Sequence, residues 1–214
     1  MMKKNIFIII ASICLMHGAY AQDSVSVKMN QIDEYRKSLL AHKHEFLSVG
    51  FPLKWYADVD SIFYYFKDNC LVLIEHSSDE IIDGDSYVVR AIAYKRVYFS
   101  GNRLCLEEEY TKSYAEHQRV AEDKSRFIVE IYNYMNEKRN YYDITNDHEL
   151  SFVSRQLEAP EAMADSLFNT TEWYFFDISK YKYSRGRNTF RSLLEQIKEN
   201  GFILPEGVIM PYSD

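Results

Sequence analysis

The chain has 214 residues, with 25 lysines and arginines against 32 aspartates and glutamates, which gives a formal net charge of −7. An acidic protein repels the phosphates of nucleic acids and has no general attraction to anionic lipids, so we exclude nucleic acid as a partner. The hydrophobic content of 47% is enough for a real core, and one compact domain is the expected organisation.

The first 21 residues have the three zones of a bacterial secretory signal peptide. Lys3 and Lys4 form a basic start, residues 6–16 are an apolar run, and an Ala-x-Ala cleavage site ends at Ala21. A transmembrane helix needs about 20 apolar residues, so this run is too short to be an anchor. We therefore expect a mature protein, residues 22–214, without a membrane span, in the periplasm or outside the cell.

The mature chain is expected to begin with a loose lead over residues 22–28 and a helix over Asn30–Leu47. Within Asn30–Leu47, apolar side chains recur every three or four residues, which is typical of a helix with one buried face. The same spacing predicts a second helix over Asp58–Lys67, although its aromatic residues would also suit a strand.

The middle of the chain has the pattern of an antiparallel sheet. Cys70–Ile74 is expected to be a buried strand, and the polar, acidic segment His76–Asp85 a loop. A β-hairpin is expected over residues 87–111, because Gly101-Asn102 can adopt the positive φ angles of a two-residue turn.

That turn predicts a specific register for the hairpin. It places Phe99 opposite Leu104 and the basic residues of the first strand opposite the glutamates of the second. The predicted charge pairs are Arg96 with Glu107 and Lys95 with Glu108.

The second half is expected to add three helices and two strands. The helices cover Ser125–Arg139, Pro160–Phe168 and Asn188–Gly201, and the strands cover Leu150–Leu157 and Thr171–Ile178, the latter buried. The tail Phe202–Pro211 is expected to pack. The expected fold class is α+β, with an N-terminal helix, a central antiparallel sheet and a C-terminal helix.

Two cysteines remain after the signal peptide, Cys70 and Cys105. An oxidising compartment favours a disulfide between them. The expected strand order, however, separates them by two strand spacings, about 9–10 Å, whereas a disulfide needs Cα atoms within about 7 Å. The sequence leaves this bond open.

One basic segment stands out in the acidic chain, just before the expected helix at Asn188. Its candidate ligand-binding residues are Lys180, Tyr181, Lys182, Tyr183, Arg185 and Arg187. Four cations, two tyrosines and a helix N-terminus together could bind an anionic ligand, a glycan or a protein. The competing interpretation is a solvated loop whose cations balance nearby acids.

No motif for catalysis or metal binding is present. The histidines do not have the spacing of zinc ligands, and no nucleophile motif occurs. We therefore expect no metal, no other cofactor and no catalytic residues, and a non-catalytic binding module of the cell envelope. The alternatives are an exported hydrolase that uses carboxylates or a histidine, and an acidic inhibitor that binds a secreted enzyme through Asp79, Glu80 and Asp83.

Overall fold

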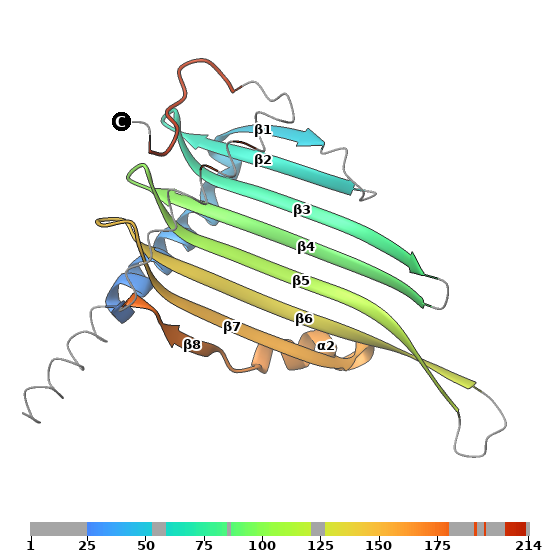
Figure 1. Ribbon diagram of the computed structural model, residues 1–214. Helices are drawn as coiled ribbons and strands as arrows, with labels where there is room; N and C mark the ends of the chain where they lie inside the picture. The colour runs from blue at the N-terminus through green and yellow to red at the C-terminus, as the bar shows by residue number, and fades with distance from the viewer. Residues whose placement is uncertain are drawn as a thin grey trace, which may run out of the picture. The chain divides into compact units, whose positions relative to one another are not determined.

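The computed structural model describes residues 25–52, 59–84, 87–120, 127–179, 191, 195 and 204–212. They belong to two units, one that ends at His42 and one that begins at Lys43. In the first unit, residues 25–42 form a helix, and in the second an eight-stranded antiparallel sheet carries helix α2 (Glu161–Thr170). The fold is therefore α+β, as expected, and most of it is sheet (Figure 1).

Every strand pairs with the strand that follows it in the sequence, so the sheet order is β1-β2-β3-β4-β5-β6-β7-β8. The strands are β1 (Leu47–Pro52), β2 (Val59–Lys67), β3 (Cys70–Gly84), β4 (Tyr87–Ser100), β5 (Arg103–Val120), β6 (Phe127–Asp143), β7 (His148–Pro160) and β8 (Tyr174–Asp177). A 3₁₀ turn, Lys43–Glu45, precedes β1, and α2 lies between β7 and β8. In this topology one turn after another sets the register of the whole sheet.

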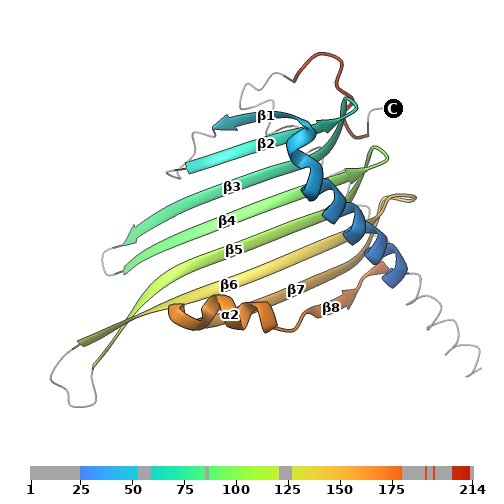
Figure 2. The same cartoon turned by 180° about the vertical axis from the view of Figure 1, so that it is seen from behind.

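The two faces of the sheet are covered differently. Side chains alternate between the faces along each strand. On one face, which we call the α2 face, Met135 of β6 and Ala159 of β7 pack against Ala164 and Phe168 of α2. Figure 2 shows α2 lying over β6 and β7 on this side.

The opposite face, which we call the tail face, carries the larger hydrophobic cluster. Its buried side chains come from β2 to β6 and are Tyr64, Phe66, Leu71, Ile74, Val97, Phe99, Leu104 and Tyr142. From residues 204–212, the side chains of Leu204, Val208, Met210 and Tyr212 pack against this cluster. The expectation that the tail packs is thus confirmed for its described part.

The tail segment also contacts three hairpin turns at one end of the sheet. The backbone N–H of Ile209 donates to the Asn69 carbonyl at 2.7 Å, at the β2–β3 turn. The backbone N–H of Tyr212 donates to the Asn102 carbonyl at 3.2 Å, at the β4–β5 turn. The Tyr212 hydroxyl donates to Asp147 at 2.6 Å, at the β6–β7 turn. Residues 209–212 therefore tie together turns that belong to different hairpins.

The hairpin between β4 and β5 forms as predicted at its turn. Gly101 and Asn102 have φ angles of 55° and 65°, as a type I′ turn requires. Phe99 lies opposite Leu104, which confirms the predicted pair. A register shift between Tyr98 and Phe99 then adds one residue to β5.

This bulge changes the charge pairs. The predicted pairing of Arg96 with Glu107 and Lys95 with Glu108 is wrong by one residue, because Arg96 lies opposite Glu108 and Lys95 opposite Glu109. A bulge has no sequence signature strong enough to reveal it. Its consequence is that Glu108 shares the α2 face with Arg96, whereas Glu107 lies on the tail face, 3.2 Å from the Lys95 ammonium.

Two segments expected to be helical are strands. Asp58–Lys67 contains β2, and Ser125–Arg139 lies largely within β6. Both are rich in aromatic and β-branched residues, which favour pleated sheet, and short apolar runs fit either period. The expected loop His76–Asp85 is also wrong over its described part, because β3 continues through it to Gly84.

At the N-terminus, the helix begins before the expected Asn30 and ends before Leu47. The described part of the lead expected to be loose, residues 25–28, is helical, so that expectation is wrong. The signal peptide of residues 1–21 lies outside the described residues.

The helix expected after Pro160 is confirmed as α2, which makes it internal to the chain. Of the expected C-terminal helix, Arg191 and Glu195 are described and are helical, and the rest lies outside the described residues. The strand expected within Thr171–Ile178 is confirmed as β8, but its expected burial is wrong, because β8 is an edge strand with exposed aromatic residues.

Cys70 and Cys105 are free thiols. Cys70 opens β3 and Cys105 lies in β5, with β4 between them. Burial raises the pKa of the Cys105 thiol to about 12. The Cys105 Sγ donates to the Tyr98 carbonyl at 3.3 Å. Among the described helices, none combines the length and hydrophobicity of a membrane span.

We predict that iodoacetamide modifies Cys70 but not Cys105 in the folded protein. The reagent attacks the thiolate, and a buried thiol with a raised pKa supplies almost none at pH 8. Peptide mass spectrometry before and after unfolding in urea measures this, with Cys70 as the internal reference. A disulfide-linked peptide containing both cysteines would contradict it.

Candidate functional site

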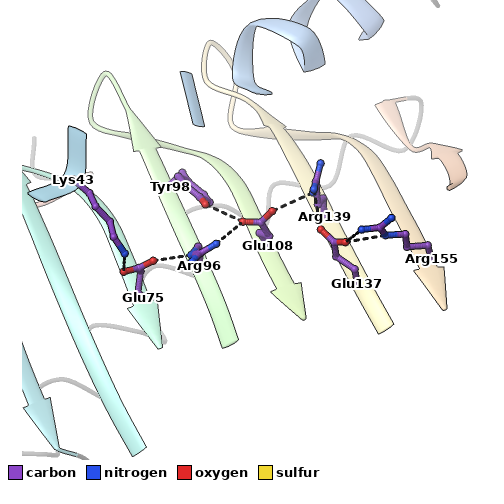
Figure 3. Close-up of polar contacts among 8 residues, drawn as sticks. All are labelled: Lys43, Glu75, Arg96, Tyr98, Glu108, Glu137, Arg139 and Arg155. Carbon is purple, nitrogen blue, oxygen red and sulfur yellow. Dashed lines mark hydrogen bonds and ion pairs between the residues drawn. The ribbon is translucent and has the colours of Figure 1, made fainter. Parts of the chain in front are cut away.

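A row of alternating charges crosses the α2 face. The register places Glu75 of β3 opposite Arg96 of β4, Arg96 opposite Glu108 of β5, and Glu108 opposite Arg139 of β6. Figure 3 shows these side chains lying side by side across the strands. Opposite charges on adjacent strands stabilise a sheet, so the row fixes the register of four strands.

The row continues at both ends. On one side the Lys43 ammonium lies 2.6 Å from Glu75, whose other oxygen accepts from the Arg96 Nε at 2.7 Å. On the other side Arg139 reaches Glu137 at 2.8 Å. Glu137 in turn accepts two hydrogen bonds from Arg155, at 2.6 and 2.9 Å. The result is an unbroken chain of ion pairs, which we call the charge ladder, from Lys43 to Arg155 (Figure 3).

Glu108 is the centre of the charge ladder. Its carboxylate is only 2% exposed and contacts three groups. The Tyr98 hydroxyl donates to it at 2.9 Å, Arg139 Nε lies at 3.2 Å and Arg96 Nη1 at 3.6 Å. A carboxylate this buried needs such compensation.

Aromatic rings flank the cations of the ladder. Arg96 lies 4.7 Å from the Tyr94 ring centroid. Arg139 and Arg155 each lie 4.7 Å from Trp173, which therefore contacts both guanidinium groups. These cation–π contacts exclude water from the pairs and strengthen them.

The pKa of Glu75 reflects this environment. Burial is the largest effect and would raise it, but hydrogen bonds from Lys43, Tyr65 and Arg96 together bring the pKa below its usual value of 4.5. The Glu75 carboxylate is thus ionised at neutral pH and suited to binding cations rather than to donating a proton. We interpret the charge ladder as a structural element of the sheet.

We predict that Glu108→Ala lowers the free energy of unfolding by about 2–3 kcal/mol, because the half-buried Arg96 and Arg139 each lose one of their carboxylate partners and the buried Tyr98 hydroxyl loses this acceptor. Urea denaturation measures this. The matched control is Asp79→Ala, which breaks the fully exposed β3–β4 pair of Asp79 with Arg90 and should have little effect. Equal losses in the two variants would contradict a central role for Glu108.

We further predict that the difference in stability between wild type and Glu75→Gln depends on pH. The folded pKa of Glu75 is lowered, so its contribution is present above the unfolded-state pKa and is lost as the pH falls through the folded value. Free energies of unfolding measured from pH 7 down to 3 should be farthest apart at neutral pH and should approach each other as the pH falls below the unfolded-state pKa of about 4.3. Parallel curves would contradict the prediction.

The tail face carries a different feature, an open polar groove over β5, β6 and β7. Its volume is about 520 Å³. Two cross-strand rows of polar residues line it, Thr111–Asn136–Gln156 and Ser113–Tyr134–Glu158. In each row the three residues lie directly opposite one another, so their polar groups are spaced by the strand separation of about 4.8 Å.

Tyr134 and Glu158 interact within the groove. The Tyr134 hydroxyl hydrogen-bonds to the Glu158 carboxylate. Desolvation, together with the charge and hydrogen bond of Glu158, raises the pKa of Tyr134. This contact orients the Tyr134 ring, which lines the groove.

Small side chains border the groove on β4. Ala93 lies opposite Thr111, and Ala91 lies opposite Ser113. On the neighbouring strand β3, Ser78 lies opposite Ala93. The row that runs from Ser78 to Gln156 therefore crosses five strands without a charged residue, on the face that Figure 1 presents to the viewer.

Of the residues singled out from the sequence, none that the structure describes lines this groove. The basic segment, Lys180, Tyr181, Lys182, Tyr183, Arg185 and Arg187, lies outside the described residues. Of the acidic segment, Asp79 accepts two hydrogen bonds from Arg90, at 2.9 and 2.5 Å. No three His, Cys, Asp or Glu side chains in the described ranges are grouped as metal ligands.

Sequence reasoning missed the groove because it assigned Ser125–Arg139 to a helix. In a helix, Tyr134 and Asn136 point in different directions, whereas in β6 they share a face. The sequence signal for the groove was the occurrence of polar residues two positions apart, at 111 and 113, at 134 and 136, and at 156 and 158.

Comparisons with known proteins gave no match. No family model, no curated protein and no solved structure is significantly similar to this chain.

Proposed function

We propose that this protein is a non-catalytic binding module, and that the polar groove on the tail face binds a glycan. The observation that carries the proposal is the pair of cross-strand rows, Thr111–Asn136–Gln156 and Ser113–Tyr134–Glu158. They present hydroxyl, amide and carboxylate groups in a regular array on a rigid sheet.

The chemistry of the array suits a polyhydroxylated ligand. The amides of Asn136 and Gln156 can each donate and accept, as adjacent sugar hydroxyls do. An aromatic ring with a polar tip, such as Tyr134, offers an apolar surface to a sugar ring and a hydrogen bond at its edge. The two rows are about 7 Å apart and span about 10 Å across three strands, which is the size of one or two sugar units.

The location inferred from the sequence supports the same proposal. A cleaved signal peptide would deliver the module to the cell envelope or beyond, where polysaccharides are accessible. The basic, tyrosine-rich segment that begins at Lys180 remains a second proposed contact, for an anionic part of the ligand or for a protein partner.

We expect Tyr134→Ala and Gln156→Ala each to weaken oligosaccharide binding by about tenfold, the equivalent of one lost hydrogen bond or ring contact. Calorimetric titration with a panel of neutral and acidic oligosaccharides measures this. Both residues line an open groove, so the melting temperature should stay close to that of wild type.

The control for this experiment is Tyr174→Ala, which removes an exposed tyrosine from β8, outside the groove. Binding that is unchanged in the groove variants but lost in this control would refute the proposed site. Release of shorter sugars during the titration would instead indicate the alternative function of an exported hydrolase.

A further inference from the structure

Among the described residues, β8 is the last strand of the sheet and its outer edge is unpaired. It pairs with β7 on one side, through Ser151–Ser154, and stands at the end of the strand order. On its other side, no strand among the described residues pairs with it. Unpaired edges can accept another strand, and proteins usually protect them with lysine, proline or a bulge.

The backbone groups that face this open edge can be identified. The N–H of Ile178 donates to the carbonyl of Leu150 at 3.2 Å, in the pair next to Asp177 and Ser151. Hydrogen-bonded residues alternate along an antiparallel pair. The N–H and C=O of Phe175, and those of Asp177, therefore point away from β7.

The side chains of β8 are aromatic and exposed. Tyr174, Phe175 and Phe176 are 61%, 43% and 52% exposed, respectively. Aromatic residues are enriched at protein interfaces, and an exposed group of them on a strand edge is unusual for a surface that meets only water. These exposures indicate a docking surface rather than a solvated edge.

The aromatic rings of β8 and an acid beside them favour a basic partner. Tyr174 and Phe176 share one face of β8, and the exposed acid Glu172 precedes them. Aromatic faces and a carboxylate both attract lysine and arginine side chains, and the chain as a whole has a net charge of −7. In an added strand, alternate residues would lie beside Tyr174 and Phe176.

We propose that β8 binds an extended, basic segment of a partner protein as an additional strand of the sheet. The backbone of Phe175 supplies the main-chain hydrogen bonds, and the rings of Tyr174 and Phe176 select basic side chains at alternate positions. This mode of recognition takes its affinity from the strand edge and its specificity from the side chains. It is independent of the groove on the tail face.

The test uses the whole protein and a fluorescent peptide of alternating arginine and valine, compared with a peptide of alternating glutamate and valine. We expect the arginine peptide to bind at least about tenfold more tightly, as measured by fluorescence anisotropy. Equal binding of the two peptides would overturn the assignment of a basic partner.

Two variants at one position separate the backbone from the ring. Phe175→Pro removes the outward N–H without removing a hydrogen bond to β7, and edge strands tolerate proline. Phe175→Val keeps the backbone N–H and replaces the ring with a β-branched side chain that suits a strand. We expect the proline variant to lose about tenfold more affinity than the valine variant, and equal affinities would overturn strand addition.

A modified peptide covers the case in which Phe175→Pro does not fold. An arginine–valine peptide N-methylated at every second residue cannot donate backbone hydrogen bonds along one edge, and wild-type protein should bind it at least about tenfold more weakly. Full binding of this peptide would overturn the proposal. So would a concentration-dependent dimer that blocks peptide binding in light scattering, since a second copy would then occupy β8.

Discussion

The structure depends on the register of adjacent strands. Because each strand pairs with the next one in the sequence, an error of one residue at any turn would reverse the faces of every strand beyond it. The positive φ angles of Gly101 and Asn102 set one such turn, and Asp68 and Asn69, at 51° and 61°, set another. The charge ladder then enforces the same register far from the turns, because Glu75, Arg96, Glu108 and Arg139 meet only in this alignment. The turn residues and the ion pairs therefore each specify the same strand register.

The two faces of the sheet divide the roles of its polar residues. On the α2 face, charged groups are paired and flanked by aromatic rings, so their interactions are directed at one another. On the tail face beyond the hydrophobic cluster, the mostly uncharged polar groups of the groove are directed at the surrounding solvent. The bulge before Phe99 creates this division, because it moves Glu108 to one face and Glu107 to the other. A single inserted residue therefore decides which glutamate joins the charge ladder.

The sequence predicted local features well and long-range ones poorly. The turn at Gly101-Asn102, the helix after Pro160 and the strand near Leu150 depend on a few adjacent residues, and all three are present. The Asp68-Asn69 turn was not predicted, because the aromatic segment before it has the apolar spacing of a helix. Asp and Asn both tolerate positive φ angles, and that was the signal for the turn. The charge ladder and the groove could not be predicted, since each requires the register of several strands and the bulge shifts that register by one residue. The candidate site suggested from the sequence and the site suggested by the structure are therefore different parts of the chain.

The position of the tail contacts has a consequence for biosynthesis. Ile209 and Tyr212 are translated after all eight strands, yet they bond to turns made by Asn69, Asn102 and Asp147. The hairpins of the sheet can form one after another as the chain emerges, because all of their pairings are local. The contacts that join these turns form only after residues 209–212 have been translated. A chain that stops before residue 209 would keep its hairpins but lack these contacts, which gives cellular proteases a physical basis for degrading it.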